Sequence, residues 1–119
     1  MSNDEVTITP SHTDHRGTLI AAEFSDVPFV VARVFVVRGP EGGAVRGNHT
    51  VAGTQLLILL SGTSTIEFGT DADHLDHVVT LTETGSRILL ADGTYIRYAL
   101  PDEHSSILVL CEQPFTARS

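Results

Sequence analysis

The chain has 119 residues, enough for one domain with its own core, and a formal net charge of −8 from 15 acidic and 7 basic side chains. All seven bases are arginine, and an acidic surface without basic clusters argues against nucleic acid and against anionic membranes as partners. No apolar run is long enough to span a membrane, and the first ten residues lack the basic and apolar regions of a signal peptide.

Short apolar runs separated by Gly, Pro and Asp recur along the chain about every ten residues, which is typical of an all-β sandwich or barrel. No stretch shows helical periodicity, so we predict little or no helix and a single domain over residues 1–119. In chain order, strands are predicted within residues 28–39, 54–62 and 63–69, on either side of residues 83–85, and within residues 94–100 and 105–112.

Turn signals separate these runs. Ser61-Gly62 joins two of them and predicts a hairpin. Residues 71–77, DADHLDH, have the composition of a metal cluster, but they fall in a predicted hairpin loop, where we expect a solvated acidic tip. Residues 12–17, HTDHRG, predict the entry to the first strand. Cys111 is the only cysteine and lies in the last run, so we expect a buried, unreactive thiol and a cytoplasmic location.

Two of the runs indicate how their strands are buried. Residues 55–60, QLLILL, are continuously apolar, which is typical of a strand covered on both faces. In the first run Arg33 alternates with Phe35 and Val37 and so shares their face. An inward Arg needs an anion, which is either a carboxylate of the protein or part of a ligand.

The region around His49 resembles the first motif of the cupin superfamily, in which Gly, His-x-His, Glu and Gly recur at fixed spacing. Gly85 and the residues after it resemble the second cupin motif, and both frames fit without a gap. The resemblance implies a cupin, or jelly-roll, β-barrel. The first frame reads Gly43, His49, Val51, Gln55 and Gly62, and the second reads Gly85, Ala91, Gly93, Ile96 and Leu100.

The cupin frame keeps one of its metal ligands. A metal-binding cupin brings two His, a carboxylate and a third His to one ion, whereas Val51, Gln55 and Ile96 occupy three of those positions. Val and Ile cannot coordinate a metal, and a neutral amide is a poor ligand for transition metals. One His cannot hold zinc or iron, which need three or four ligands. We therefore predict neither a metal ion nor another cofactor.

A narrower resemblance covers residues 14–111 and points to the sugar 3,4-ketoisomerases (FdtA/QdtA, WxcM-like), which are cupins without metal. It implies a dimer that moves a ketone between carbons 3 and 4 of a dTDP-linked 6-deoxy sugar. The chain departs from that family at the second motif His, which is Val51, at an expected Tyr, which is Phe35, and at a Trp-His pair, which is Tyr95-Ile96. The resemblance rests on Asp14, Arg16-Gly17, Pro28-Phe29, Arg33-Val34-Phe35, Arg46-Gly47-x-His49, Gln55 and Gly62.

The candidate site residues follow from these frames. His49 is the candidate general base, because the pKa of an imidazole can lie near neutrality. Tyr98 shares the face of Ile96 and could donate a phenolic proton, as could Tyr95 from the other register. Gln55, on the strand that we expect to pair with the His49 strand, could orient a hydroxyl. The remaining candidates for substrate binding are Arg33, Phe35, Arg46, Val51, Leu57 and Ile96; Arg97 is expected to face away from them.

The preferred function is an isomerase that acts on a sugar nucleotide or a related secondary metabolite by proton transfer through His49. The loss of the second His leaves two alternatives open. An apolar barrel could orient and cyclise a hydrophobic, polyketide-like intermediate, or the chain could bind a small molecule without turning it over. In each case the partner is a small molecule, and we expect a homodimer.

Overall fold

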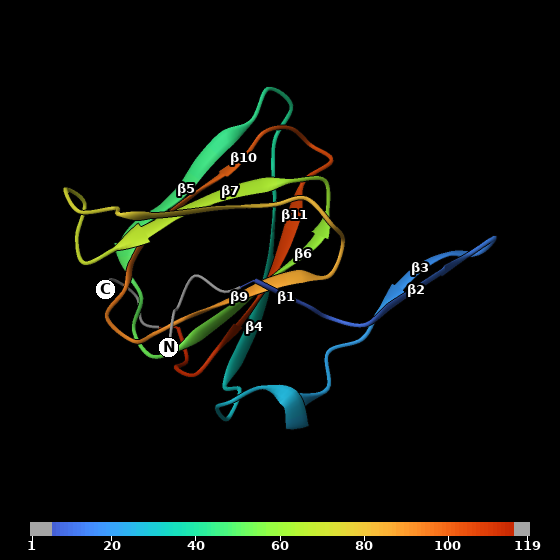
Figure 1. Cartoon of the computed structure of the whole chain (residues 1–119), viewed down its shortest axis with the longest axis horizontal. Helices are drawn as coiled ribbons and strands as arrows, with labels where there is room; N and C mark the ends of the chain where they lie inside the picture. Colours follow the sequence, from blue (N-terminus) through green and yellow to red (C-terminus); the bar gives the residue numbers. More distant parts are fainter. Residues whose placement is uncertain (1–5, 116–119) are drawn as a thin grey trace.

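The computed structural model describes residues 6–115, which form an all-β fold with one short 3-10 helix (Figure 1). The predicted fold class is confirmed. The strands are β1 (Thr7–Ile8), β2 (Ser11–Asp14), β3 (Gly17–Ile20), β4 (Arg33–Arg38), β5 (Ala44–Thr50), β6 (Gln55–Ser61), β7 (Ser64–Gly69), β8 (His77–Leu81), β9 (Ser86–Leu90), β10 (Tyr95–Leu100) and β11 (Ser106–Cys111), and the helix η1 spans Phe24–Asp26.

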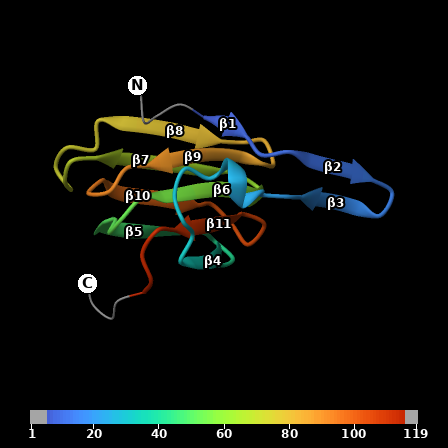
Figure 2. The ribbon, with the colours of Figure 1, turned by 90° about the horizontal axis from the view of Figure 1, so that it is seen from below.

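Two antiparallel sheets form the layers of the barrel. The five-stranded sheet has the order β1-β9-β6-β11-β4, and the four-stranded sheet has the order β5-β10-β7-β8. Figure 2 shows the strands of each sheet following one another from top to bottom, with β2 and β3 extending beyond the sheets as a separate two-stranded hairpin. Residues 12–17, expected at the entry to the first strand, instead span most of β2, the turn and the first residue of β3.

From β4 onward the chain crosses from one sheet to the other at nearly every connection. The predicted hairpin at Ser61-Gly62 is therefore wrong, because β6 lies in the five-stranded sheet and β7 in the four-stranded sheet. Both edges of β6 are already occupied by β9 and β11, so β7 has no edge there to pair with. The hairpin predicted around residues 71–77 is confirmed, since β7 pairs with β8.

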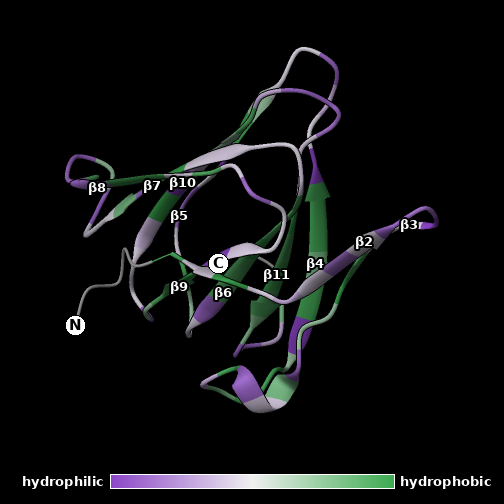
Figure 3. Cartoon of the chain, turned by 45° about the vertical axis from the view of Figure 1, so that its right-hand side comes forward, coloured by the Kyte–Doolittle hydropathy of each residue, from purple (hydrophilic) through white to green (hydrophobic). Residues whose placement is uncertain are grey.

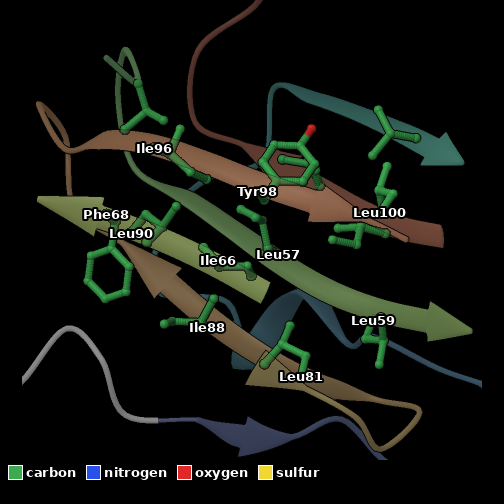
Figure 4. Packing of buried hydrophobic residues seen from close by; sticks show 14 of the residues in the cluster. Leu57, Leu59, Ile66, Phe68, Leu81, Ile88, Leu90, Ile96, Tyr98 and Leu100 are labelled. Carbon is green, nitrogen blue, oxygen red and sulfur yellow. The ribbon is translucent and has the colours of Figure 1, made fainter. Parts of the chain in front are cut away.

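The apolar run of β6 is buried on both faces, as its sequence predicts. Leu57 and Leu59 are 1% and 0% exposed in the main core, and Figure 4 shows their side chains among those of β7, β9 and β10. Leu56 and Ile58 point to the opposite face, where residues 22–31 cover them. Burial of each such side chain stabilises the fold by about 1.5–3 kcal/mol.

Strand β4 forms one edge of the five-stranded sheet and alternates as predicted. Arg33, Phe35 and Val37 lie on the inward face, while Val34 and Val36 are exposed. Figure 3 shows β4 as an apolar strand with hydrophilic ends. Within residues 6–115, no helix has the length and apolar character needed to cross a membrane.

Candidate functional site

A cavity of about 600 Å³ lies between the two sheets, beside the edge strands β4 and β5. Its walls come from β4, β6 and β11 on one side and from β5 and β10 on the other. Eight of the ten predicted site residues line it: Arg33, Phe35, Arg46, His49, Gln55, Leu57, Ile96 and Tyr98.

The other two predicted residues lie outside the cavity lining. Val51 is 1% exposed and belongs to the main core, where its N–H donates to the Thr94 carbonyl at 2.8 Å. Tyr95 pairs with Thr50 and points to the face opposite Ile96. Substitution of the second motif His by Val51 therefore extends the core.

A β-bulge brings Arg46 and His49 to the same wall. In the pairing of β5 with β10, Ile96 lies opposite His49 and Tyr98 opposite Arg46, although the two β5 residues are three apart. Side chains of a regular strand alternate between faces, so an odd separation would place these two on opposite sides. The extra residue is Asn48, at φ 61°, and it follows Gly47 at φ 90°. The Gly-Asn pair is the sequence signal that could have revealed this bulge.

The His49 ring has one nitrogen engaged and one free to act as a base. Its Nδ1 lies 3.2 Å from the carbonyl oxygen of Thr50. A carbonyl can only accept, so Nδ1 carries the hydrogen in this contact, and the lone pair of the neutral ring is then on Nε2. The side chain is exposed, which gives substrate access to the ring.

Tyr98 contributes a buried phenol to the same cavity. Its side chain is 7% exposed, and Figure 4 shows the hydroxyl directed away from Ile66 and Ile88. Burial raises the pKa of Tyr98 above its usual 10.0, and the charge and hydrogen bond of Arg46 oppose this rise. The phenol is therefore neutral at physiological pH and can donate a proton.

Arg33 contacts two aromatic rings in the lining of the cavity. Its Cζ is 4.6 Å from the centroid of Phe35 and 4.9 Å from the centroid of Phe115. Phe115 is a lining residue that sequence reasoning missed, because it follows the last strand and belongs to no motif. Beside Arg33, Cys111 is 1% exposed, and burial raises the pKa of its thiol while the Arg33 charge opposes the rise. This fits the predicted buried thiol.

The cavity is cationic. Its lining includes Arg33 and Arg46 but no Asp or Glu, and neither arginine forms an ion pair with a carboxylate of residues 6–115. By contrast, Arg97 faces outward as predicted and meets Glu67 at 2.9 Å. Of the two partners considered for an inward arginine, a carboxylate of the protein is therefore not found for Arg33 or Arg46 within residues 6–115, and an anion of a ligand is the one that stays open.

Gln55 reaches the cavity from a different direction than predicted. The strand of His49 pairs with β10, whereas Gln55 begins β6 in the other sheet, because residues 51–54 carry the chain across. The amide therefore lies across the cavity from the β5 wall.

The residues of the cavity do not fit the metal centre of a cupin. The lining contains one imidazole and no carboxylate. Across the described part of the chain, no three His, Cys, Asp or Glu side chains gather as a ligand set. In the loop after β7, Asp71, Asp73 and His74 are exposed, with Asp71 and His74 joined at 2.8 Å, which agrees with the predicted solvated tip.

Comparison with known proteins places this chain in a family. The family model described as FdtA, WxcM-like, C-terminal, matches residues 2–119. No curated protein sequence gives a significant match.

Several solved structures share the fold. The WlaRB TDP-quinovose 3,4-ketoisomerase from Campylobacter jejuni is 22% identical over 99% of this chain and 91% of that chain, with a TM-score of 0.79. QdtA, a sugar 3,4-ketoisomerase from Thermoanaerobacterium thermosaccharolyticum in complex with TDP, is 21% identical over 96% and 83%, also with a TM-score of 0.79. ChmJ, a 3'-monoepimerase from Streptomyces bikiniensis in complex with dTDP-quinovose, is 18% identical over 93% and 64%, with a TM-score of 0.76. At these identities the likeness establishes the shared fold.

Proposed function

The chain belongs to the WxcM-like, C-terminal (FdtA) family, and from this premise we propose that it is an isomerase of a dTDP-linked 4-keto-6-deoxy sugar. The observation that carries the proposal is the cationic cavity, in which two arginines without carboxylate partners within residues 6–115 lie beside an imidazole and a phenol. A sugar nucleotide offers the diphosphate that such arginines bind. Its ketone offers an adjacent C–H bond that a base can break.

The proposed reaction moves the ketone from carbon 4 to carbon 3 through an enediol. Nε2 of His49 takes the proton from carbon 3, and the electron pair of that C–H bond forms the C3–C4 double bond while the carbonyl oxygen at carbon 4 gains a proton from Tyr98. The hydroxyl at carbon 3 then gives its proton to the oxygen of Tyr98 while the protonated His49 ring gives its proton to carbon 4, so that a ketone forms at carbon 3 and both side chains return to their starting states. No proton, electron or leaving group is lost, and the sequence needs no co-reactant.

The arginines and the amide have supporting roles in this proposal. Arg46 lies next to Tyr98, where its charge stabilises the developing enolate. Gln55, across the cavity, can hold a sugar hydroxyl. The proposal assigns no step to a metal ion, because the cavity offers one imidazole where a cupin centre needs several ligands.

Because the second motif His is absent, the reaction needs another group to supply the rate that a second general acid–base group would contribute. One general acid–base group is typically worth about 10²–10⁴ in rate. Val51 cannot supply it from inside the core. Tyr98 is the residue in the cavity with a proton to offer, so the proposal depends on the pair His49 and Tyr98 acting together.

Proton exchange at carbon 3 tests the proposal. We would incubate the protein with dTDP-4-keto-6-deoxyglucose in D₂O and follow deuterium incorporation and product formation by NMR. We expect exchange in the native protein and a loss of at least about 100-fold in His49→Ala and His49→Gln. His104→Ala, an exposed His outside the cavity lining, is the matched control and should retain exchange. Equal exchange in the His49 variants would remove His49 from the mechanism.

Ligand binding separates the proposal from its alternatives. A ligand that binds only the folded state raises the unfolding temperature, and at 100 times Kd it adds about 2.7 kcal/mol of stability. For a chain of this length that corresponds to a Tm increase on the order of 10 °C. Stabilisation by dTDP without exchange would favour a small-molecule-binding module over an enzyme.

An apolar substrate remains the second candidate, because half of the cavity is apolar. Leu57, Ile96, Val109 and Val37 form walls that a polyketide-like intermediate could occupy. This candidate predicts no response to dTDP, whereas the two arginines favour an anionic guest.

We also propose that the protein works in the cytoplasm as a homodimer. The hairpin of β2 and β3 supports the dimer, since it extends away from the barrel and Leu19 on it is 63% exposed. An isolated two-stranded hairpin is marginally stable, so a second copy that covers it would stabilise it.

A further inference from the structure

We infer that Phe115 is a positioning residue for anion recognition, which together with Phe35 restrains the Arg33 guanidinium so that its N–H donors can bind the diphosphate of a substrate. The inference rests on the proposed sugar-nucleotide function and extends it to a residue outside the cupin motifs. The guanidinium carbon of Arg33 lies over both rings, 4.6 Å from the centroid of Phe35 and 4.9 Å from the centroid of Phe115.

The register of the five-stranded sheet explains how Phe115 reaches this place. Cys111, the last residue of β11, pairs with Arg33, the first residue of β4. The chain then leaves the sheet and, four residues later, places Phe115 against the guanidinium, with Cζ 4.9 Å from the ring centroid. Phe115 is 67% exposed and still lines the cavity, so it covers the mouth without entering the core.

The guanidinium of Arg33 contacts two rings and keeps its hydrogen-bond donors for another partner. The five N–H donors of Arg lie in the plane of the group and match two oxygens of one anion at a time. A cation–π contact does not use these donors as hydrogen bonds, so they stay available to a ligand. No carboxylate of residues 6–115 pairs with Arg33, and none lines the cavity, so a ligand anion is the partner that fits.

The two ring contacts also restrain Arg33 before the ligand arrives. A long side chain that must be ordered on binding costs part of the affinity, and holding it in place beforehand removes that cost. Cation–π contacts at partly exposed sites are worth enough to change an affinity by about threefold to tenfold. Loss of the Phe115 ring should therefore weaken anion binding by about that factor.

Calorimetric titration with inorganic pyrophosphate tests the inference in the full chain. We expect Phe115→Leu to bind pyrophosphate about threefold to tenfold more weakly than the native protein, because Leu keeps apolar cover but has no aromatic face. Phe115→Tyr, which keeps the ring, should bind within about twofold of the native protein. Phe24→Leu, at an exposed Phe in η1 that does not line the cavity, should change nothing.

A double variant checks that the effect passes through Arg33. In an Arg33→Met background, Phe115→Leu should cause no further loss of pyrophosphate affinity. The inference would be overturned if Phe115→Leu lost the same affinity in that background as in the native protein. It would also be overturned if Phe115→Leu bound pyrophosphate normally, if Phe115→Tyr bound it as weakly as Phe115→Leu, or if the native protein did not bind it at all.

Two further measurements distinguish the ligand and separate this inference from the proposed function. Titration with malonate tests whether the site prefers a dicarboxylate to a diphosphate. Tighter binding of malonate than of pyrophosphate would overturn the diphosphate assignment. If pyrophosphate binding depends on Phe115 while the sugar nucleotide undergoes no exchange at carbon 3, the proposed isomerase fails and the anion site stands. In a working isomerase, Phe115→Leu should raise KM and leave kcat nearly unchanged.

Discussion

Tyr98 shows how burial defines the role of a single side chain. The phenol lies in a core-facing position of β10, and its burial disfavours the charged tyrosinate more than Arg46 favours it. A group whose pKa is raised on folding contributes stability below its unfolded pKa. That stability is lost as the pH rises above 10.0, because the unfolded chain then releases a proton that the folded chain retains.

The loss of stability at high pH can be tested by comparing variants of the two tyrosines. Above pH 10.0 the native protein should lose thermal stability more steeply than Tyr98→Phe, which has no phenol to ionise at this position. Tyr95→Phe removes the other tyrosine, which is partly exposed, and should keep the steep loss. Thermal unfolding followed by circular dichroism on both sides of pH 10.0 makes the comparison. Parallel curves for the native protein and Tyr98→Phe would contradict the role of burial.

At the scale of single elements, the bulge in β5 controls which side chains enter the cavity. Gly47 has φ 90° and lies beside β10, the neighbouring strand of the four-stranded sheet, where a Cβ would be 2.8 Å from the Ile96 carbonyl oxygen. Gly93 has nearly the same φ, 88°, but a Cβ there would meet nothing within 4 Å. Gly47 and Gly93 therefore have the same backbone conformation, but only Gly47 is crowded by a neighbouring strand.

Alanine at these two glycines should separate the conformational cost from the steric cost. Gly93→Ala should lower the free energy of unfolding by about 1–2 kcal/mol, the cost of a left-handed conformation for a side chain with a Cβ. Gly47→Ala should cost more, because the carbonyl of the neighbouring strand must also move. It should also slow exchange at carbon 3, because a shifted bulge turns Arg46 away from His49. Denaturant unfolding and the NMR exchange measurement check both effects, and equal costs at the two sites would refute the steric argument.

The same elements show what local sequence can and cannot predict. Alternation predicted that Arg33 and Phe35 share one face, and the unbroken apolar run of β6 predicted burial on both faces; the structure confirms both and shows that the shared face of β4 points inward. The partners of the strands were not predictable in this way, since periodicity reports which face is buried and not which strand lies alongside. Gln55 was therefore assigned to the wrong sheet.

The residues of the site were likewise predictable where they depend on local sequence and not where they depend on strand pairing. The cupin frames located most of the lining, because they mark where β5 and β10 face the barrel interior. They placed Val51 in the cavity, whereas its side chain belongs to the core. Phe115 could not be inferred, because its contact with Arg33 depends on the pairing of β11 with β4.

At the scale of the whole molecule, the β2–β3 hairpin is the part that the barrel does not support. Its strands pair only with each other, and the contact between Thr13 and Thr18, 2.9 Å between hydroxyl oxygens, lies within the hairpin. Its Leu19 is exposed although it carries a large apolar side chain. These features support an interface with a second copy.

A charge placed on the hairpin should therefore shift the oligomeric state. We expect the native protein to elute as a dimer and Leu19→Asp to shift toward the monomer, because a carboxylate in an apolar contact loses its hydration. Val78→Asp introduces the same charge at a similarly exposed position on β8, and it should remain dimeric. Light scattering after size-exclusion chromatography measures the mass, and a monomeric native protein would rule out the dimer at the concentrations used.

The crossing of the chain between the sheets also governs the order in which the molecule can be made. Strand β11 lies between β6 and β4, yet both of these strands leave the ribosome well before it. Until Cys111 has been synthesised, β4 has no strand to pair with and β6 has one open edge, so an emerging chain exposes unpaired backbone and apolar side chains. Pairing over such long stretches of sequence is slow compared with hairpin formation. The five-stranded sheet can therefore be completed only after β11 has been made.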